Sequence, residues 1–177
     1  AFAKVRLSYS SQVVSRSTSD VSDEVFRIVL PADPPSAAQR LQVAPSGAAA
    51  GDQFGYSVSD AGDVNGDGYA DVIVGAHWND AGGSSAGRAY VYYGGPGADA
   101  APDLTLTGAA AGDDFGISVS GAGDVNRDGH ADVIVGAYLS YNTQGHEGRA
   151  FVYHGASSGL SLTSSWTAET DQSGVRF

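Results

Sequence analysis

The sequence predicts an all-β protein that contains two copies of one 61-residue unit. Residues 47–76 and 108–137 are identical at 25 of 30 positions, and repeats in this size range are typical of solenoids and propellers. The 177 residues include 25 glycines, and only 16% are charged. Without a long helical periodicity, that composition is typical of a turn-rich β protein. An apolar content of 42% is enough for a hydrophobic core.

The first 40 residues lie outside the repeat. Residues 1–9 largely alternate between two faces, and a second run of strand-forming residues covers 24–30. Both patterns are typical of β-strands. Three prolines follow within a short stretch, which is typical of a stiff linker. We therefore predict a short N-terminal β element at 1–30 and a Pro-rich linker at 31–40.

Each unit is predicted to form one four-stranded antiparallel sheet. In the first unit the strands are expected at about 55–62, 71–77, 88–93 and 102–107. The β-branched run that begins at Asp71 is typical of a strand covered on both faces. Along the chain the predicted segments are 41–101 for the first unit, 102–163 for the second and 164–177 for the start of a third.

An oxygen-rich loop of nine residues joins the first two strands of each unit. Side-chain oxygens at positions 1, 3, 5 and 9, with a backbone carbonyl at position 7, can surround Ca²⁺, which takes about six to eight oxygen ligands. Glycine at position 6 lets the chain turn back on the ion. The predicted ligands are Asp63, Asn65, Asp67, the Tyr69 carbonyl and Asp71 in the first loop, and Asp124, Asn126, Asp128, the His130 carbonyl and Asp132 in the second. We expect two calcium ions with a structural role.

Two alternatives compete with this calcium site. Asp, Asn and Gly also form turns without a metal, but carboxylates at alternate positions repel one another when no cation is present. An EF-hand requires a bidentate Glu at position 12, where this chain has Val74 and Val135. The β-branched run after each loop favours a strand over the exiting helix of an EF-hand.

The order of these motifs resembles the FG-GAP repeat family, which occurs in the propeller of integrin α-subunits and in other extracellular proteins. Phe54-Gly55 and Phe115-Gly116 correspond to FG, Val74-Gly75-Ala76 and Val135-Gly136-Ala137 correspond to the GAP element, and the aspartate loop lies between them. The resemblance covers about 41–177. It implies β-propeller blades, of which two are complete and a third begins at the C-terminal end. The Pro of the GAP element is replaced, and Arg127 replaces the glycine found at Gly66.

The two units differ most in the loop after the second strand. Residues 77–86 and 138–147 share no identity, although the sequences on both sides match. In the FG-GAP family this loop lies on the face opposite the calcium loops, where integrins bind ligands. The resemblance therefore implies a hypothetical contact set of His77, Trp78, Asn79, Asp80, Tyr138, Tyr141, Asn142, His146 and Glu147. The alternative is sequence drift in unconstrained loops, which tolerate change.

Charge and composition narrow the class of partner. The net charge is −11, and nine Lys and Arg residues are too few for the basic surface that nucleic acid requires. No apolar run approaches the length of a membrane-spanning helix. Without cysteine the chain forms no disulfides, so in an oxidising compartment calcium would supply the local cross-links. We expect processing or excision from a longer chain, because neither an initiator Met nor a signal peptide is present.

These observations favour an extracellular or cell-surface, calcium-stabilised module for adhesion or protein assembly. Its expected partner is a protein or carbohydrate ligand, or copies of itself joined through open blade edges. We predict that it is not an enzyme, since both Gly-x-Ser-x-Gly motifs lie in Gly/Ser-rich loops without the strand and helix of a nucleophile elbow. The alternatives are an accessory propeller of a secreted hydrolase or lyase and a structural subunit of an extracellular filament.

Overall fold

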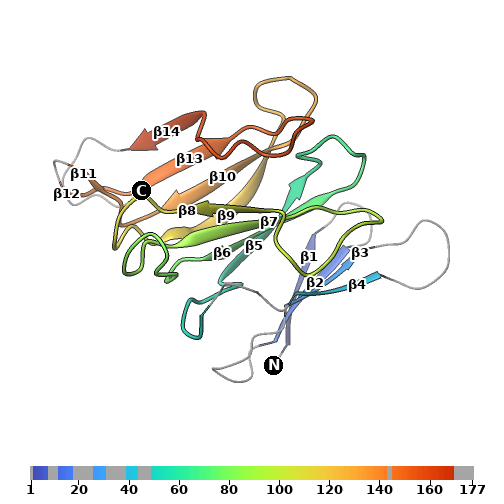
Figure 1. Cartoon of the computed structure of the whole chain (residues 1–177), viewed down its shortest axis with the longest axis horizontal. Helices are drawn as coiled ribbons and strands as arrows, with labels where there is room; N and C mark the ends of the chain where they lie inside the picture. Colours follow the sequence, from blue (N-terminus) through green and yellow to red (C-terminus); the bar gives the residue numbers. More distant parts are fainter. Residues whose placement is uncertain are drawn as a thin grey trace.

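The structure of the chain is a computed structural model in which every regular element is a β-strand (Figure 1). It describes the backbone of residues 2–7, 12–17, 26–30, 39–43, 49–142 and 145–169, and the side chains of residues 49–140 and 147–169. The strands form four-stranded antiparallel sheets and one short hairpin. The expected all-β class is therefore confirmed. In the described part of the chain, no helix has the length and apolar character that a membrane crossing requires.

The first unit forms a sheet with the strand order β5-β6-β7-β8. Its strands are β5 (Ser57–Gly62), β6 (Asp71–Ala76), β7 (Arg88–Tyr92) and β8 (Leu104–Thr107). Each strand pairs antiparallel with the next, and each lies inside the range predicted for it. All six residues of β6 are buried, as expected for an inner strand covered on both faces.

The second unit repeats this arrangement with the order β14-β13-β10-β9. Its strands are β9 (Phe115–Gly123), β10 (Asp132–Ala137), β13 (Arg149–Tyr153) and β14 (Trp166–Glu169). A hairpin of β11 (Tyr141–Asn142) and β12 (Gly145–His146) lies between β10 and β13. Strand β14 completes the second sheet, although it lies in the segment predicted to begin a third unit. Residues 170–177, the rest of that segment, lie outside the described residues.

A further sheet lies at the N-terminal end, with the order β1-β2-β3-β4. Its strands are β1 (Phe2–Leu7), β2 (Gln12–Ser17), β3 (Phe26–Leu30) and β4 (Gln39–Val43). The fourth strand begins inside the predicted linker and pairs with β3 from Leu30↔Gln39 to Phe26↔Val43. Strand pairing therefore extends beyond the boundary predicted at residue 30. Residues 31–38, where the prolines stand, lie outside the described residues.

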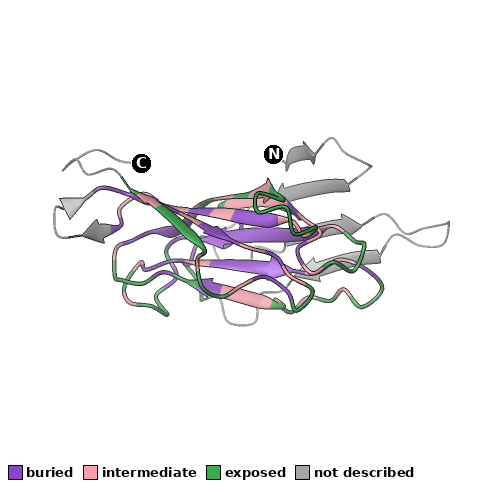
Figure 2. Ribbon diagram, turned by 90° about the horizontal axis from the view of Figure 1, so that it is seen from above, coloured by how far each residue is buried: buried purple, intermediate pink, exposed green. Residues whose placement is uncertain are grey.

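The main apolar core lies between the two repeat sheets. One face of the first sheet contributes Ile73 and Val91, and one face of the second contributes Val133 and Val135, all with 0% exposure. Buried residues accordingly fill the middle of the stacked strands in Figure 2. A second cluster, which includes Val72 and Tyr92, covers the other face of the first sheet. Period-2 alternation along β6 sends successive side chains to these two clusters.

The FG and GA elements meet where the two sheets approach each other most closely. A Cβ added to Gly75 would overlap the carbonyl oxygen of Gly116, which itself accepts a hydrogen bond of 2.7 Å from Ser57 Oγ. Phe115 N donates to Ala86 O at 3.0 Å, and the Phe115 ring is buried in the shared core. The motif residues therefore join one sheet to the next: the aromatic ring fills the core, and the glycines allow the backbones to touch.

Candidate metal centre

Both aspartate loops are held at the same place in their sheets. The first joins β5 to β6 and the second joins β9 to β10. The loop-closing aspartates lie opposite glycines in the ladder, as Gly62↔Asp71 and Gly123↔Asp132. A register shift next to each pair bends the strands at the loop. The strands at the base of each loop thus have the same pairing in both sheets.

In the first loop, Asp63 organises the turn. Its Oδ1 accepts hydrogen bonds from Gly66 N at 2.7 Å and from Asp67 N at 3.0 Å, and its Oδ2 accepts from Gly68 N at 2.9 Å. Asp67 Oδ1 in turn accepts from Tyr69 N at 2.9 Å. Gly66 and Gly68 have φ values of 75° and 88°, a region that favours glycine. Hydrogen bonds from the loop backbone to the carboxylates of Asp63 and Asp67 therefore hold the loop in its turn.

Asp71 closes the first loop from inside the protein. It is fully buried, with Val64 N donating to Oδ2 and Gly94 N donating to Oδ1, both at 2.8 Å. Burial raises the pKa of Asp71 to about 6, against the lowering effect of these two hydrogen bonds. The negative charges of Asp67 and Asp63 raise this pKa further. The three carboxylates are thus close enough to repel one another, which is the condition a bound cation relieves.

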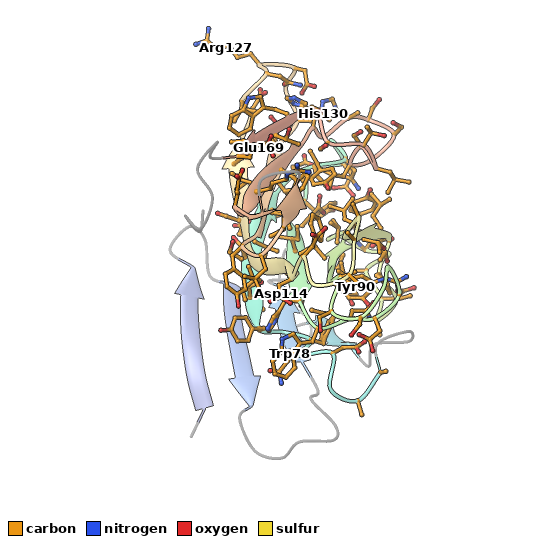
Figure 3. The ribbon with its side chains drawn as sticks, turned by 90° about the vertical axis from the view of Figure 1, so that its left-hand side faces the viewer. Trp78, Tyr90, Asp114, Arg127, His130 and Glu169 are labelled. Atoms are coloured by element: carbon orange, nitrogen blue, oxygen red, sulfur yellow. The ribbon has the colours of Figure 1, made fainter. Side chains whose placement is uncertain are left out.

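The second loop repeats most of these contacts. Asp124 Oδ1 accepts from Asp128 N at 3.0 Å and Asp124 Oδ2 accepts from Gly129 N at 2.9 Å. Asp132 is also fully buried, and it accepts from Val125 N at 2.8 Å and Gly155 N at 2.9 Å. Arg127 has a φ of 63° and is exposed, and its side chain points away from the strands in Figure 3. The exchange of glycine for arginine therefore leaves the loop path intact.

The donor atoms of both loops suit calcium. They are oxygens of Asp, of the Asn side chain and of a backbone carbonyl, which a hard cation prefers. Among the described residues, however, no three His, Asp or Glu side chains stand ready to hold one ion. In both loops the Asp oxygens accept backbone N–H groups, and Asn65 Nδ2 and Asn126 Nδ2 donate to Asp67 and Asp128. Ion binding requires these side chains to turn toward a common centre.

The predicted contact loop lies at the opposite end of the sheets. Trp78 and Asp114 stand far from Arg127 and His130 in Figure 3. Trp78 is half-exposed and Asp80 is exposed, whereas His77 and Asn79 are buried.

Asn79 has a structural role in the first unit. Its side-chain amide donates to Asp52 Oδ2 at 2.5 Å, and its Oδ1 accepts from Ala81 N at 3.0 Å. Among the four predicted contact residues of this loop, Trp78 and Asp80 are therefore the two that a partner can reach.

The second contact loop is described in part. Tyr138 is partly buried and Glu147 is buried at 1% exposure. Tyr141, Asn142 and His146 belong to the β11–β12 hairpin, and their side chains lie outside the described residues. Tyr138 makes a side-chain hydrogen bond to Asp114. The structure thus places Tyr138 at the same end of the sheets as the first contact loop, which contains Trp78.

Two residues at this end were missed by sequence reasoning. The Tyr56 ring lies 4.3 Å from the His77 ring, and the Tyr56 side chain is 48% exposed. Burial lowers the pKa of His77, and the nearby charge of Asp114 opposes that shift. Tyr56 and Asp114 were detectable, because they are among the five positions at which the matched 30-residue segments differ.

Comparison with known proteins decides the family of the two units. The FG-GAP repeat family matches the chain twice, at residues 54–92 and 115–153. Both units are FG-GAP repeats. Each match begins at the FG phenylalanine and ends with the third strand of its sheet. The FG-GAP propeller blades expected from the motifs are therefore present in two complete copies.

The curated relatives are integrin α-subunits. The chain is 39% identical to integrin alpha-7 of Rattus norvegicus over 126 residues, which covers 70% of this chain and 10% of that protein. It is 32% identical to integrin alpha-6 of Gallus gallus over 127 residues, which covers 70% of this chain and 11% of the relative. Integrin alpha pat-2 of Caenorhabditis elegans is 42% identical over 95 residues, or 51% of this chain and 8% of that protein. The chain thus spans about a tenth of the length of these relatives.

Proposed function

We propose that this chain is an extracellular propeller module, stabilised by two calcium ions, that serves adhesion or protein assembly. The observation that carries the proposal is the pair of aspartate loops, which have the same donor pattern and share two backbone hydrogen bonds to the first aspartate in two FG-GAP repeats. Similarity to integrin α-subunits supports an adhesive role and a location outside the cell. It also favours a binding module over the accessory propeller of an enzyme.

Calcium would act here as a structural cross-link. The first ion would be held by Asp63, Asn65, Asp67, the Tyr69 carbonyl and Asp71, and the second by Asp124, Asn126, Asp128, the His130 carbonyl and Asp132. Each set comes from one short loop and leads directly into a buried inner strand, β6 or β10. Neutralising the repulsion in the loop would therefore stabilise the sheet itself.

The proposed contact surface lies at the opposite end, around the half-exposed rings of Trp78 and Tyr56. Buried His77 lies behind both rings, with centroid distances of 5.4 Å to Trp78 and 4.3 Å to Tyr56. Aromatic side chains fixed in this way often dominate the energy of a protein interface. We propose a protein partner. Among the described residues, no observation favours a carbohydrate ligand or pairing with further copies of the chain.

Calorimetric titration of the chelated protein with calcium tests the metal centre. We expect two ions per chain in the native protein, and one in each of the variants Asp67→Ala and Asp128→Ala. Extracellular calcium modules bind at about 10⁻⁴–10⁻³ M, so the titration should extend to several millimolar. Absence of binding in that range would refute the proposal.

Attachment to immobilised extracellular matrix protein tests the contact surface. Trp78→Ala should weaken attachment while leaving calcium binding unchanged, because the side chain is far from both loops. Trp166→Ala is the matched control, since Trp166 is equally exposed, at 55% against 50%, but lies on the outer strand β14. Equal attachment by the native protein and the Trp78 variant would show that Trp78 does not contribute to binding, and would contradict the proposed contact surface.

A further inference from the structure

The two aspartate loops are joined by hydrogen bonds between the repeats. Ala131 N, between the position-7 and position-9 residues of the second loop, donates to the carbonyl oxygen of Asp63 at 2.8 Å. Ala156 N donates to the carbonyl oxygen of Val64 at 3.0 Å. Asp63 and Val64 are the first two residues of the first loop. The second repeat therefore holds the entry of the first loop at two points.

The corner that follows strand β13 contacts both loops. Gly155 N donates to Asp132 Oδ1 in the second loop at 2.9 Å, and its neighbour Ala156 makes the bond to Val64 O in the first. Val64 N in turn donates to Asp71 Oδ2 at 2.8 Å. A continuous chain of bonds thus runs from one buried loop aspartate to the other through the corner Gly155-Ala156.

Packing between the loops is as close as the hydrogen bonds. A Cβ added to Gly155 would overlap the carbonyl oxygen of Ala131 and lie 2.7 Å from that of Val64. A Cβ added to Gly62 would lie 2.6 Å from Ala131 Cβ, and one added to Gly66 would lie 2.8 Å from His130 Nε2. Because close-packed interiors transmit strain, we expect a shift of one loop to move the other.

We propose that the Gly155-Ala156 corner couples the two calcium sites, so that an ion in one loop strengthens binding in the other. The inference rests on the calcium role proposed above. Calcium in the second loop would fix Asp132 and His130, and with them Ala131 and the corner, which position the entry of the first loop. By linkage, the first ion would strengthen binding of the second by the same factor. Without this link, repulsion between two cations would make the sites independent or mutually weakening.

The repeat supplies an internal control for the corner. Gly94 is the residue that corresponds to Gly155, 61 positions earlier. Its N–H donates to Asp71 Oδ1 at 2.8 Å, and an added Cβ would overlap the carbonyl oxygen of Ala70. Its contacts therefore stay within the first repeat. Gly155 makes the equivalent contact to Ala131 and in addition faces Val64 of the other loop.

Terbium luminescence excited through Tyr69 reports chiefly on the first loop. Tb³⁺ replaces Ca²⁺ in oxygen sites and is excited through a nearby aromatic ring, which position 7 of the first loop provides as Tyr69 and position 7 of the second does not, because it is His130. Native protein is titrated with terbium and compared with Asp128→Ala, which disables the second loop. We expect the affinity of the first loop to fall at least about fivefold, the lower end of typical coupling factors.

The glycine variants test the corner. Gly155→Ala should weaken terbium binding at Tyr69 although Gly155 belongs to neither loop. Gly94→Ala should weaken binding at the first loop but keep the link, because its contacts stay within the first repeat. Adding Asp128→Ala to it should therefore lower the first-loop affinity by the same factor as in the native protein. Thermal unfolding in chelator identifies a variant that fails to fold, and Asp128→Ala then decides the question alone.

The outcomes separate the two proposals. Two ions that bind with a first-loop affinity equal in native protein and Asp128→Ala would overturn the coupling and leave the calcium role standing. Absence of both terbium and calcium binding in native protein would overturn both. Reduced first-loop affinity in Asp128→Ala and in Gly155→Ala would support the coupling through the corner.

Discussion

Asp71 and Asp132 anchor the loops through hydrogen bonds with the backbone. Each is fully buried and accepts two backbone N–H groups, one from its own loop and one from the corner after the third strand. A buried carboxylate needs such donors, since an unpaired buried charge is costly. Among the remaining loop carboxylates, Asp67, Asp124 and Asp128 are exposed and Asp63 is partly buried. Calcium would therefore bind a loop whose closing aspartate is already held in place by backbone hydrogen bonds.

The charge of Asp67 should have opposite effects with and without calcium. It raises the pKa of buried Asp71 by like-charge repulsion, so Asp67→Asn should leave the chelated protein as stable as the native one or slightly more stable. With calcium the same variant loses an anionic ligand. At a concentration of a hundred times the dissociation constant, bound calcium adds about 2.7 kcal/mol, of which the variant should lose the greater part. Thermal unfolding in chelator and in calcium measures the change in stability under each condition.

Asp128→Asn is the matched change in the second loop and should likewise lose the greater part of the calcium stabilisation. In chelator it should be slightly destabilising, because the hydrogen bonds from His130 N and the Asn126 side chain lower the pKa of Asp128. A loss of stability that is equal in chelator and in calcium would contradict the account, because it would assign the two aspartates a role in the turn alone.

His77 should make stability depend on pH. Its burial lowers its pKa below the ordinary value of 6.5, with the charge of Asp114 acting in the opposite direction. The unfolded chain therefore takes up the proton first, so stability is full above about pH 6.5 and falls as the pH drops through the lowered folded-state pKa. His77→Phe keeps an aromatic ring against Tyr56 and removes the proton. Its stability should fall less than that of the native protein below pH 6.5, as measured by urea unfolding. Parallel curves for both proteins would show that His77 does not titrate in this way.

At the residue scale, the position of the aspartate loops could be predicted from the sequence, whereas the contacts of the predicted contact surface could not. Alternate Asp and Asn residues predict a calcium loop by their spacing. The burial of Asn79 depends on Asp52, 27 positions away, and the contact of His77 with Tyr56 depends on how the loop folds back. Such contacts leave no local pattern.

The elements were largely predictable because each has a local signature. The inner strand β6 is a continuous apolar run, and Gly-rich loops bound it on both sides. The closing strands were harder to assign. Strand β14 completes the second sheet but follows the repeat unit along the chain, so the sequence unit and the sheet are offset by one strand. The pairing of β4 with β3 was missed because prolines precede it in the sequence.

Gly75 should be the least replaceable residue of β6. An added Cβ would overlap the backbone oxygen of Gly116 in the neighbouring sheet, which cannot move without separating the sheets. Gly75→Ala should therefore destabilise the protein by about 1–3 kcal/mol, as overpacking does.

Gly136 is the matched position in the second repeat. There an added Cβ would meet chiefly the Ser118 hydroxyl, a side-chain group that can rotate away. Gly136→Ala should cost less than Gly75→Ala in urea unfolding. Equal costs would mean that the close approach of the two sheets does not determine stability.

At the scale of the whole molecule, two FG-GAP sheets share one core and carry their aspartate loops at one end and their aromatic surface at the other (Figure 3). This separation would let the proposed structural ions and the proposed contact surface occupy the same blades without interfering. The aligned 126–127 residues make up about a tenth of these relatives, and propellers typically have about four to eight blades. Changes at the aromatic end should therefore leave calcium binding unaffected, and changes in the loops should affect both blades.

Thermal unfolding of the native protein in chelator and in millimolar calcium tests the central claim most directly. If two calcium ions hold the blades, the melting temperature should rise with calcium concentration, because an ion that binds only the folded state stabilises it by mass action. Magnesium at the same concentration should have a smaller effect, since it demands a stricter octahedral geometry. Coincident melting curves in chelator and in calcium would contradict the account.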